Sequence, residues 1–203
     1  MSFQAKSPLL LLGTRNAGKL HEIETILADV PLRVRSLNDF ANIGIPPETA
    51  PTYAENAISK AQFYARATGL NALADDSGLE VAALGGAPGV LSARYAGEGA
   101  SDADRRALLL SQLARTTSGN RGARFVCAVA VATPEGEVVN TAEGVCEGTI
   151  IFTERGANGF GYDPLFVPDG FDRTFAELSD SIKNEISHRA RALRQTREFL
   201  LSQ

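Results

Sequence analysis

The chain has 203 residues, of which 44% are hydrophobic, and a formal net charge of -4 at pH 7. This length and composition can bury a sizeable core as one large domain or as two closely joined lobes. The acidic balance argues against a general nucleic-acid or anionic-membrane surface, which needs an extended basic field. The longest aliphatic run near the start, Leu9 to Leu12, is far shorter than the ~20 residues that span a bilayer, and no signal peptide is evident.

The two cysteines, Cys127 and Cys146, lie far apart in settings rich in Val, Ala and Gly. They have no His or Cys companions at a zinc-ligand spacing. We interpret them as reduced thiols in the core of a cytoplasmic protein. We therefore expect a cytoplasmic location, with no nucleic-acid partner and no membrane partner.

The first third of the chain predicts a strand, a polar loop and a helix. Pro8 to Gly13 has the apolar run of a short buried strand, and apolar residues from Leu20 to Val30 recur at helical spacing. A second short strand is expected at Arg33 to Ser36, followed by an irregular loop rich in Gly and Pro. A capping-box signature then predicts a helix over 52–68.

In the middle of the chain, Leu73 and Ala74 predict a buried strand that ends in an acidic turn at Asp75 to Gly78. A helix is expected over Asp102 to Arg115, with acidic residues in its first turn. From Arg124 to Thr133, larger and smaller apolar residues alternate, and turn residues then lead into Val138. This pattern predicts a hairpin, not a βαβ repeat.

The last quarter of the chain predicts further strand character at Gly144 to Phe152, a Gly-rich turn at Gly156 to Gly161 and a short strand at Leu165 to Val167. A closing helix is expected to end near Leu201. Helix-linked strands on both sides of a central hairpin indicate an α/β fold with a mixed sheet.

The loop between the first strand and the first helix is a candidate phosphate site. Backbone N–H groups and the helix dipole favour an anion there, and a lysine would add a mobile charge. The loop consists of Thr14, Arg15, Asn16, Ala17, Gly18 and Lys19. It lacks the P-loop pattern, so an ordinary strand-to-helix turn explains the loop nearly as well.

Asp75 and Asp76 are neighbours at the end of an apolar run. If both are in strand conformation, their side chains point to opposite faces. Two adjacent carboxylates in such a place indicate a cation or a strong hydrogen-bond network. A turn-forming pair that solvates Gly78 is an equal alternative.

A polar stripe follows one face of the helix after Pro51, formed by Thr52, Glu55, Asn56 and Ser59, with Lys60 at its edge. The usual meaning of such a stripe is a solvated helix face, and without outside support we prefer that interpretation.

Three potential donors lie near the C-terminus: Lys183, His188 and Arg189. In one continuous helix Lys183 and His188 would be about 140° apart, so they could not share a face. We therefore predict a break, with Ser187 as the N-cap of the last helix. An exposed basic patch is the alternative.

Taken together, these segments resemble one family, the non-canonical purine nucleotide pyrophosphatases, also called dITP/XTP or inosine triphosphate pyrophosphatases. The matching segments cover nearly the whole chain, in order. They are TRNAGK at Thr14 to Lys19, ENA at Glu55 to Ala57, ADDSGLEV at Ala74 to Val81, GGAPGVLSARYAG at Gly85 to Gly97, FGYDP at Phe160 to Pro164, and SHRARAL at Ser187 to Leu193.

The resemblance implies an α/β fold with an elongated mixed sheet and flanking helices, in which residues 1–203 form a single domain of two lobes around a central substrate groove. It implies a homodimer. It also implies hydrolysis of ITP, dITP and XTP between the α and β phosphates, which releases pyrophosphate and keeps deaminated purines out of DNA and RNA.

The resemblance further implies roles for single residues. Asp76 is the expected general base and Mg²⁺ ligand, with Glu48 as a second carboxylate of the metal site. Lys60 is expected to assist at the phosphates. Thr14 to Lys19 and Ser77 are expected to hold the phosphates and ribose. The expected base-binding residues are Phe160, Gly161, Tyr162, Asp163, Lys183, His188 and Arg189.

Base selection has a physical reason. A 6-oxo group accepts hydrogen bonds from Lys183, His188 or Arg189, whereas the 6-amino group of adenosine would leave those donors unpaired, at roughly 1 to 3 kcal/mol each. Phe160 is a candidate stacking partner for the purine, or equally a core plug at a tight turn.

Two other functions compete with this hypothesis. A phosphohydrolase for other nucleotides would turn over different bases at comparable rates. A nucleotide-binding regulator would sense triphosphates without cleaving them. The pair Asp75 and Asp76 argues against the regulator, because carboxylates near a polyphosphate help little unless a metal intervenes.

Overall fold

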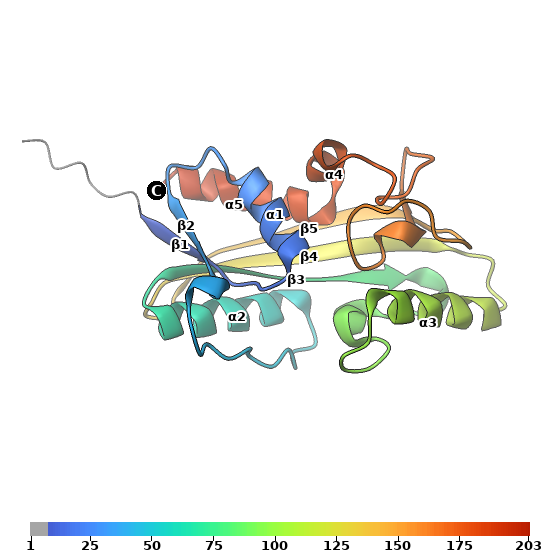
Figure 1. The fold of residues 1–203 in the computed structure, drawn as a ribbon, viewed down its shortest axis with the longest axis horizontal. Helices are drawn as coiled ribbons and strands as arrows, with labels where there is room; N and C mark the ends of the chain where they lie inside the picture. The colour runs from blue at the N-terminus through green and yellow to red at the C-terminus, as the bar shows by residue number, and fades with distance from the viewer. Residues whose placement is uncertain (1–7) are drawn as a thin grey trace, which may run out of the picture. The chain divides into compact units, whose positions relative to one another are not determined.

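The computed structural model describes residues 8–203, and its six strands form one sheet in the order β2-β1-β3-β4-β5-β6 (Figure 1). The strands are β1 (Leu9–Leu12), β2 (Arg33–Ser36), β3 (Asn71–Val81), β4 (Gly122–Ala132), β5 (Val138–Ile150) and β6 (Phe166–Pro168). β1 pairs in parallel with β2 and β3, whereas β5 and β6 are antiparallel. The predicted α/β fold with a mixed sheet is therefore confirmed.

Five α-helices accompany the strands in the described part of the chain. They are α1 (Ala17–Ile26), α2 (Tyr53–Thr68), α3 (Asp102–Arg115), α4 (Asp180–Ile186) and α5 (His188–Leu201). Short 3-10 turns occur at Leu37–Asp39, Ala82–Leu84, Gly89–Arg94 and Asp163–Leu165.

The chain folds into two compact units, and neither is one continuous stretch of sequence. Unit 1 comprises residues up to Asp76 together with Ala128–Ala142 and Leu193–Gln203. Unit 2 comprises Ser77–Cys127 and Glu143–Ala192. The prediction of a single domain of two lobes around a groove stays a prediction.

In unit 1, α1 and α2 lie on opposite faces of the parallel strands (Figure 1). The strand order explains this, because the connection from β1 to β2 and the connection from β2 to β3 run in opposite directions across the sheet. Right-handed crossovers then place their helices on opposite faces. Ala57, Ala61 and Ala65 recur every four residues on α2 and are fully buried, which lets the helix pack closely.

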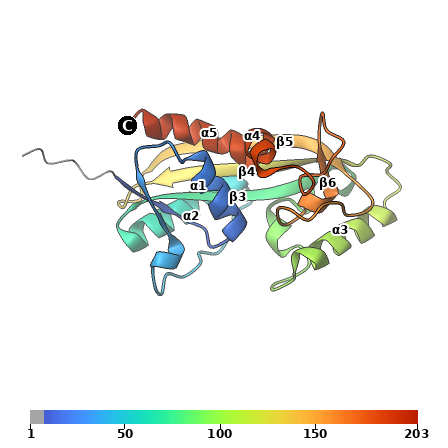
Figure 2. The same cartoon turned by 45° about the horizontal axis from the view of Figure 1, so that its top comes forward.

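In unit 2, α3 and α4 lie on opposite faces of the strands (Figure 2). An aromatic group fills the core, with the ring centroid of Phe166 at 4.7 Å from that of Phe125 and 5.1 Å from that of Phe175. Leu109 and Leu113, four residues apart on α3, join the same core.

The predicted acidic turn at Asp75 to Gly78 is wrong. These residues lie inside β3, which continues to Val81. Leu79 and Val81 are fully buried and resume the apolar alternation after the polar residues, and nearby lysines neutralise the carboxylates that a turn would have placed in water. Likewise, the strand expected at Gly144 to Phe152 is the second half of one long strand, β5.

Several element boundaries agree with the sequence. β2 and α3 have the predicted limits, and Thr52 is the N-cap of α2, where its hydroxyl accepts a hydrogen bond from the Glu55 amide. The helix break is also confirmed, because α4 ends at Ile186 and the Ser187 hydroxyl accepts from the Ala190 amide in the first turn of α5.

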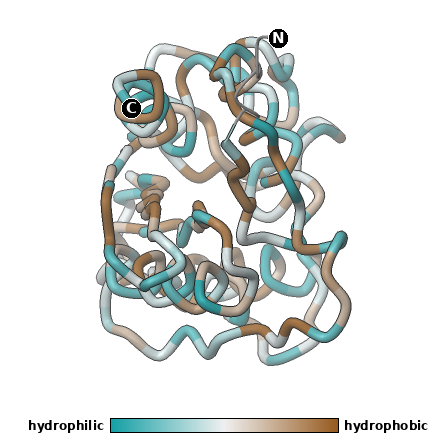
Figure 3. Tube along the Cα trace, turned by 90° about the vertical axis from the view of Figure 1, so that its left-hand side faces the viewer, coloured by the Kyte–Doolittle hydropathy of each residue, from teal (hydrophilic) through white to brown (hydrophobic). Residues whose placement is uncertain are grey.

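Among residues 8–203, no helix is long and apolar enough to cross a membrane. Figure 3 shows hydrophobic and hydrophilic stretches alternating along the trace.

Candidate active site

The turn between β1 and α1 has the geometry of an anion site in unit 1. Asn16 is the N-cap of α1, and its side chain accepts a hydrogen bond from the Lys19 amide at 2.9 Å. The Asn16 amide in turn donates to the Thr14 hydroxyl. Ala17 and Gly18 form the first turn of the helix, where backbone N–H groups have no partner within the helix.

Arg15 points away from this turn. Its guanidinium donates to the Ile43 carbonyl at 2.9 Å, on the loop that carries Glu48. The structure therefore connects Arg15 to the loop before α2, a contact between residues 28 positions apart.

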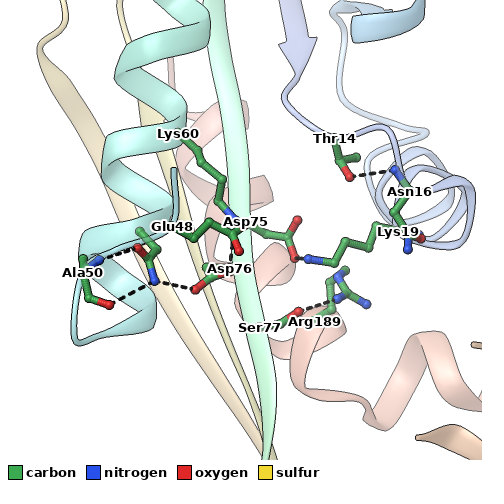
Figure 4. A network of polar contacts seen from close by, with 11 residues as sticks. Thr14, Asn16, Lys19, Glu48, Ala50, Lys60, Asp75, Asp76, Ser77 and Arg189 are labelled. Atoms are coloured by element: carbon green, nitrogen blue, oxygen red, sulfur yellow. Dashed lines mark hydrogen bonds and ion pairs between the residues drawn. The ribbon is translucent and has the colours of Figure 1, made fainter. Parts of the chain in front are cut away.

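Asp75 and Asp76 point to opposite faces of β3, as strand geometry requires. Figure 4 shows Asp75 directed at Lys19 and Asp76 directed at Lys60. The ion pairs measure 2.9 Å and 3.0 Å. Both carboxylates are buried, so each needs its lysine.

Lys60 contacts the two carboxylates that the family resemblance implies for a metal site. Its ammonium lies 2.7 Å from Glu48 and 3.0 Å from Asp76 (Figure 4). The second Asp76 oxygen accepts a hydrogen bond from the Asn56 side-chain Nδ2 at 3.1 Å. We call Lys19, Glu48, Lys60, Asp75 and Asp76 the carboxylate cluster.

The preference for a solvated stripe on α2 is wrong for two of its members. Asn56 and Lys60 are 1% and 6% exposed and face inward, whereas Thr52, Glu55 and Ser59 are exposed. Asn56 was not assigned a role from the sequence. Its spacing of four from Lys60 was the available signal, because two such residues lie on one helix face.

Burial and charge act in opposite directions on the pKa values in this cluster. Burial raises the pKa of Asp76 above its ordinary value, and Lys60 opposes that rise. Burial lowers the pKa of Lys60, but the negative charges of Asp76, Asp75 and Glu48 outweigh burial, so the Lys60 pKa is raised overall. Lys60 thus stays charged at neutral pH, while Asp76 becomes a better proton acceptor.

The donor set fits Mg²⁺. Glu48 and Asp76 contact the same Lys60 ammonium group, so both place carboxylate oxygens around one charged group. In the described residues, no group of three or more His, Cys, Asp or Glu side chains is placed to hold a metal. Two carboxylates completed by water and phosphate oxygens suit Mg²⁺, which retains several waters.

A second cluster lies in unit 2, around the loop 160–163. The Asp163 carboxylate accepts hydrogen bonds from the Phe160 amide at 2.9 Å and from the Lys183 ammonium at 2.6 Å. The Lys183 ammonium lies 4.7 Å from the centroid of the Phe160 ring, and the Arg189 guanidinium lies 5.6 Å from it. We call Phe160, Asp163, Lys183 and Arg189 the aromatic–basic cluster.

Two aromatic residues of this loop have different places. Phe160 is only half-buried, and cations lie over its ring, which favours the stacking role over the core plug. Tyr162 is the core plug instead. It is 4% exposed, and its hydroxyl donates to the Ser92 carbonyl at 3.0 Å.

The start of α5 is held firmly in unit 2. Arg189 is 1% exposed and donates to the Ser77 hydroxyl at 2.9 Å, and the His188 ring stacks on Phe125 at 4.7 Å. Gly144 of β5 allows this close packing. A Cβ atom there would collide with the His188 carbonyl oxygen and lie 2.6 Å from the Ala192 amide nitrogen.

The structure thus places the predicted carboxylates and the turn from Thr14 to Lys19 in unit 1, and the residues expected to bind the base in unit 2. A family model described as "Ham1 family" matches residues 10–199. The chain belongs to the Ham1 family. This confirms the family resemblance inferred from the motifs.

Relatives and solved structures agree with this membership. The chain is 52% identical to a dITP/XTP pyrophosphatase from Syntrophobacter fumaroxidans, over 94% of this chain and 82% of that protein. It is 50% identical to a dITP/XTP pyrophosphatase from Streptomyces avermitilis, over 92% and 94%. A HAM1 protein structure from Coxiella burnetii superposes with a TM-score of 0.89 at 42% identity, over 97% of this chain and 100% of that one.

Proposed function

We propose that this member of the Ham1 family hydrolyses ITP, dITP and XTP to the nucleoside monophosphate and pyrophosphate, and so removes deaminated purines from the nucleotide pool. The carrying observation is the buried carboxylate cluster, in which Asp76 is held between Lys60 and Asn56. The similarity to two dITP/XTP pyrophosphatases at about half of all positions supports the substrate class.

The carboxylate cluster supplies the chemistry. The N–H groups at the start of α1 and the Lys19 ammonium bind the triphosphate. The Asp76 carboxylate accepts the proton of the water that attacks the α-phosphorus, and Lys60 offsets the negative charge that develops on the phosphate oxygens. Asp76 and Glu48 would hold Mg²⁺, which neutralises phosphate charge and makes water more acidic when bound.

The aromatic–basic cluster supplies the selection of the base. Phe160 stacks on the purine, and Lys183 with Arg189 donates to the 6-oxo group. His188 is expected to assist them. Adenosine would place its 6-amino donor against the Lys183 and Arg189 donors. Each buried donor left unpaired costs roughly 1 to 3 kcal/mol. Several such penalties together reject ATP.

The deciding experiment measures pyrophosphate release from ITP, XTP, GTP, ATP and dUTP, each with Mg²⁺ and with a chelator. We expect fast, Mg²⁺-dependent release from ITP and XTP only. Equal rates on all five would indicate a general phosphohydrolase. Tight binding without release would indicate a sensor of triphosphates.

We also expect a homodimer in the cytoplasm, as implied by the motifs. Light scattering of the purified protein at micromolar concentration tests the dimer, and a monomer would remove it.

A further inference from the structure

Two residues outside the predicted site hold the backbone of the loop 160–163. Asp102 and Arg106 lie four positions apart in the first turns of α3, so their side chains share one helix face. The Asp102 carboxylate accepts a hydrogen bond from the Gly161 amide at 2.7 Å, and the Arg106 guanidinium donates to the Gly161 carbonyl at 2.9 Å. Both polar groups of Gly161 are thus held by one helix.

Arg106 also makes an ion pair. The Arg106 guanidinium lies 2.9 Å from the Glu154 carboxylate, and the Arg106 side chain is 14% exposed. A charge that is mostly buried and paired holds its geometry better than a solvated surface arginine does. The contact of Arg106 with Gly161 is therefore better ordered than a contact made by an exposed arginine.

The loop benefits from such a hold because its glycines give the backbone wide conformational freedom. Gly156, Gly159 and Gly161 all adopt positive φ, a region that glycine enters without strain. Gly161 directly follows Phe160, whose amide binds Asp163. The orientation of the Phe160 ring and of the Asp163 carboxylate therefore depends on where Gly161 lies.

We propose that Asp102 and Arg106 are positioning residues for base recognition, which hold Phe160 and Asp163 in the orientation that a purine requires. They touch no reacting atom. Their effect is to order the loop before the nucleotide arrives, which lowers the entropy that binding must overcome. The choice of ITP as ligand rests on the proposed function.

The kinetic test compares Arg106→Gln and Asp102→Ala with Arg115→Gln, which removes an exposed charge from the last turn of the same helix. We expect the KM for ITP to rise roughly tenfold in the first two variants, with kcat changed by less than about twofold. Asp102→Asn keeps an acceptor oxygen and should restore most of the affinity. A lower melting temperature with an unchanged KM would reduce both residues to a structural role and overturn the proposal.

A second test does not depend on activity. The chain has no tryptophan, so Phe160→Trp places a single reporter in the loop. We expect acrylamide quenching of this reporter to increase when Arg106→Gln is added and to stay unchanged with Arg115→Gln. Equal quenching in all three proteins would overturn the proposal. Increased quenching, if the wild-type protein leaves ITP intact, would retain the positioning role of Asp102 and Arg106 and refute the pyrophosphatase assignment alone.

Discussion

The carboxylate cluster and the aromatic–basic cluster balance charge in opposite ways. In unit 1, three carboxylates pair with two lysines, and the groups project from β3, from the helices α1 and α2, and from the loop before α2. In unit 2, two cations lie over one aromatic ring, and one of them, Lys183, also pairs with the single carboxylate, Asp163. Surplus negative charge suits a cation and a proton acceptor, whereas surplus donors suit the oxo groups of a base.

The largest effect is expected from Asp76→Asn, which removes the proposed proton acceptor of the carboxylate cluster. We expect kcat for ITP to fall by about 10²- to 10⁴-fold, the usual contribution of a general base. The measurement is steady-state pyrophosphate release. Turnover near that of the wild type would show that Asp76 is not the general base.

The same variant has a matched stability measurement. Burial raises the pKa of Asp76 in the folded protein, so the stability that its proton contributes is lost as pH rises through that raised value. At pH 7 the carboxylate therefore costs stability, and the neutral amide avoids this cost. We expect the melting temperature of Asp76→Asn at pH 7 to equal or exceed that of the wild type.

A pH profile tests the coupling within the carboxylate cluster. Because the proposed base Asp76 must be deprotonated to accept a proton, the acid limb of kcat/KM should lie above the ordinary carboxyl pKa of 3.8. Lys60 opposes the rise of the Asp76 pKa, so Lys60→Gln should move the limb to still higher pH and lower kcat/KM about 10- to 100-fold near neutrality. Lys60→Arg keeps the charge and should leave the limb near its original place. A limb at the same pH in all three proteins would contradict the coupling.

In the aromatic–basic cluster, Lys183→Gln should act on binding more than on chemistry. We expect the KM for ITP to rise about tenfold, with a smaller change in kcat, because one donor to the base is lost. Arg173→Gln removes an exposed charge from the same unit and should change neither constant. A loss confined to kcat would place Lys183 in the chemistry and break the contrast between the clusters.

The smallest effect is expected from Arg15→Ala, which removes the hydrogen bond to the Ile43 carbonyl. This contact is exposed, so its loss should cost little. We expect the Mg²⁺ concentration for half-maximal activity to rise about two- to fourfold, because the loop with Glu48 loses one anchor. An unchanged Mg²⁺ dependence would show that the Arg15 contact does not influence Mg²⁺ binding.

Local signals in the sequence predicted more than long-range ones. The limits of α3 agree with the acidic residues of its first turn, and the break at Ser187 agrees with a capping residue within one turn of the helix. The continuation of β3 through Asp75 and Asp76 was missed, because strand pairing and distant lysines stabilise it. The two hydrogen bonds that hold Gly161 could not be predicted from spacing, because their partners on α3 are 55 and 59 positions away.

Gly144 is a position at which we expect almost no substitution to be tolerated. It carries no functional group, yet any side chain there would collide with the backbone at the start of α5, which carries His188 and Arg189. A map of tolerated substitutions would therefore mark Gly144 as strictly as Arg189. Intolerance to mutation in this protein thus extends to the backbone that supports the proposed binding residues. A count of intolerant positions would therefore exceed the number of residues that contact the nucleotide.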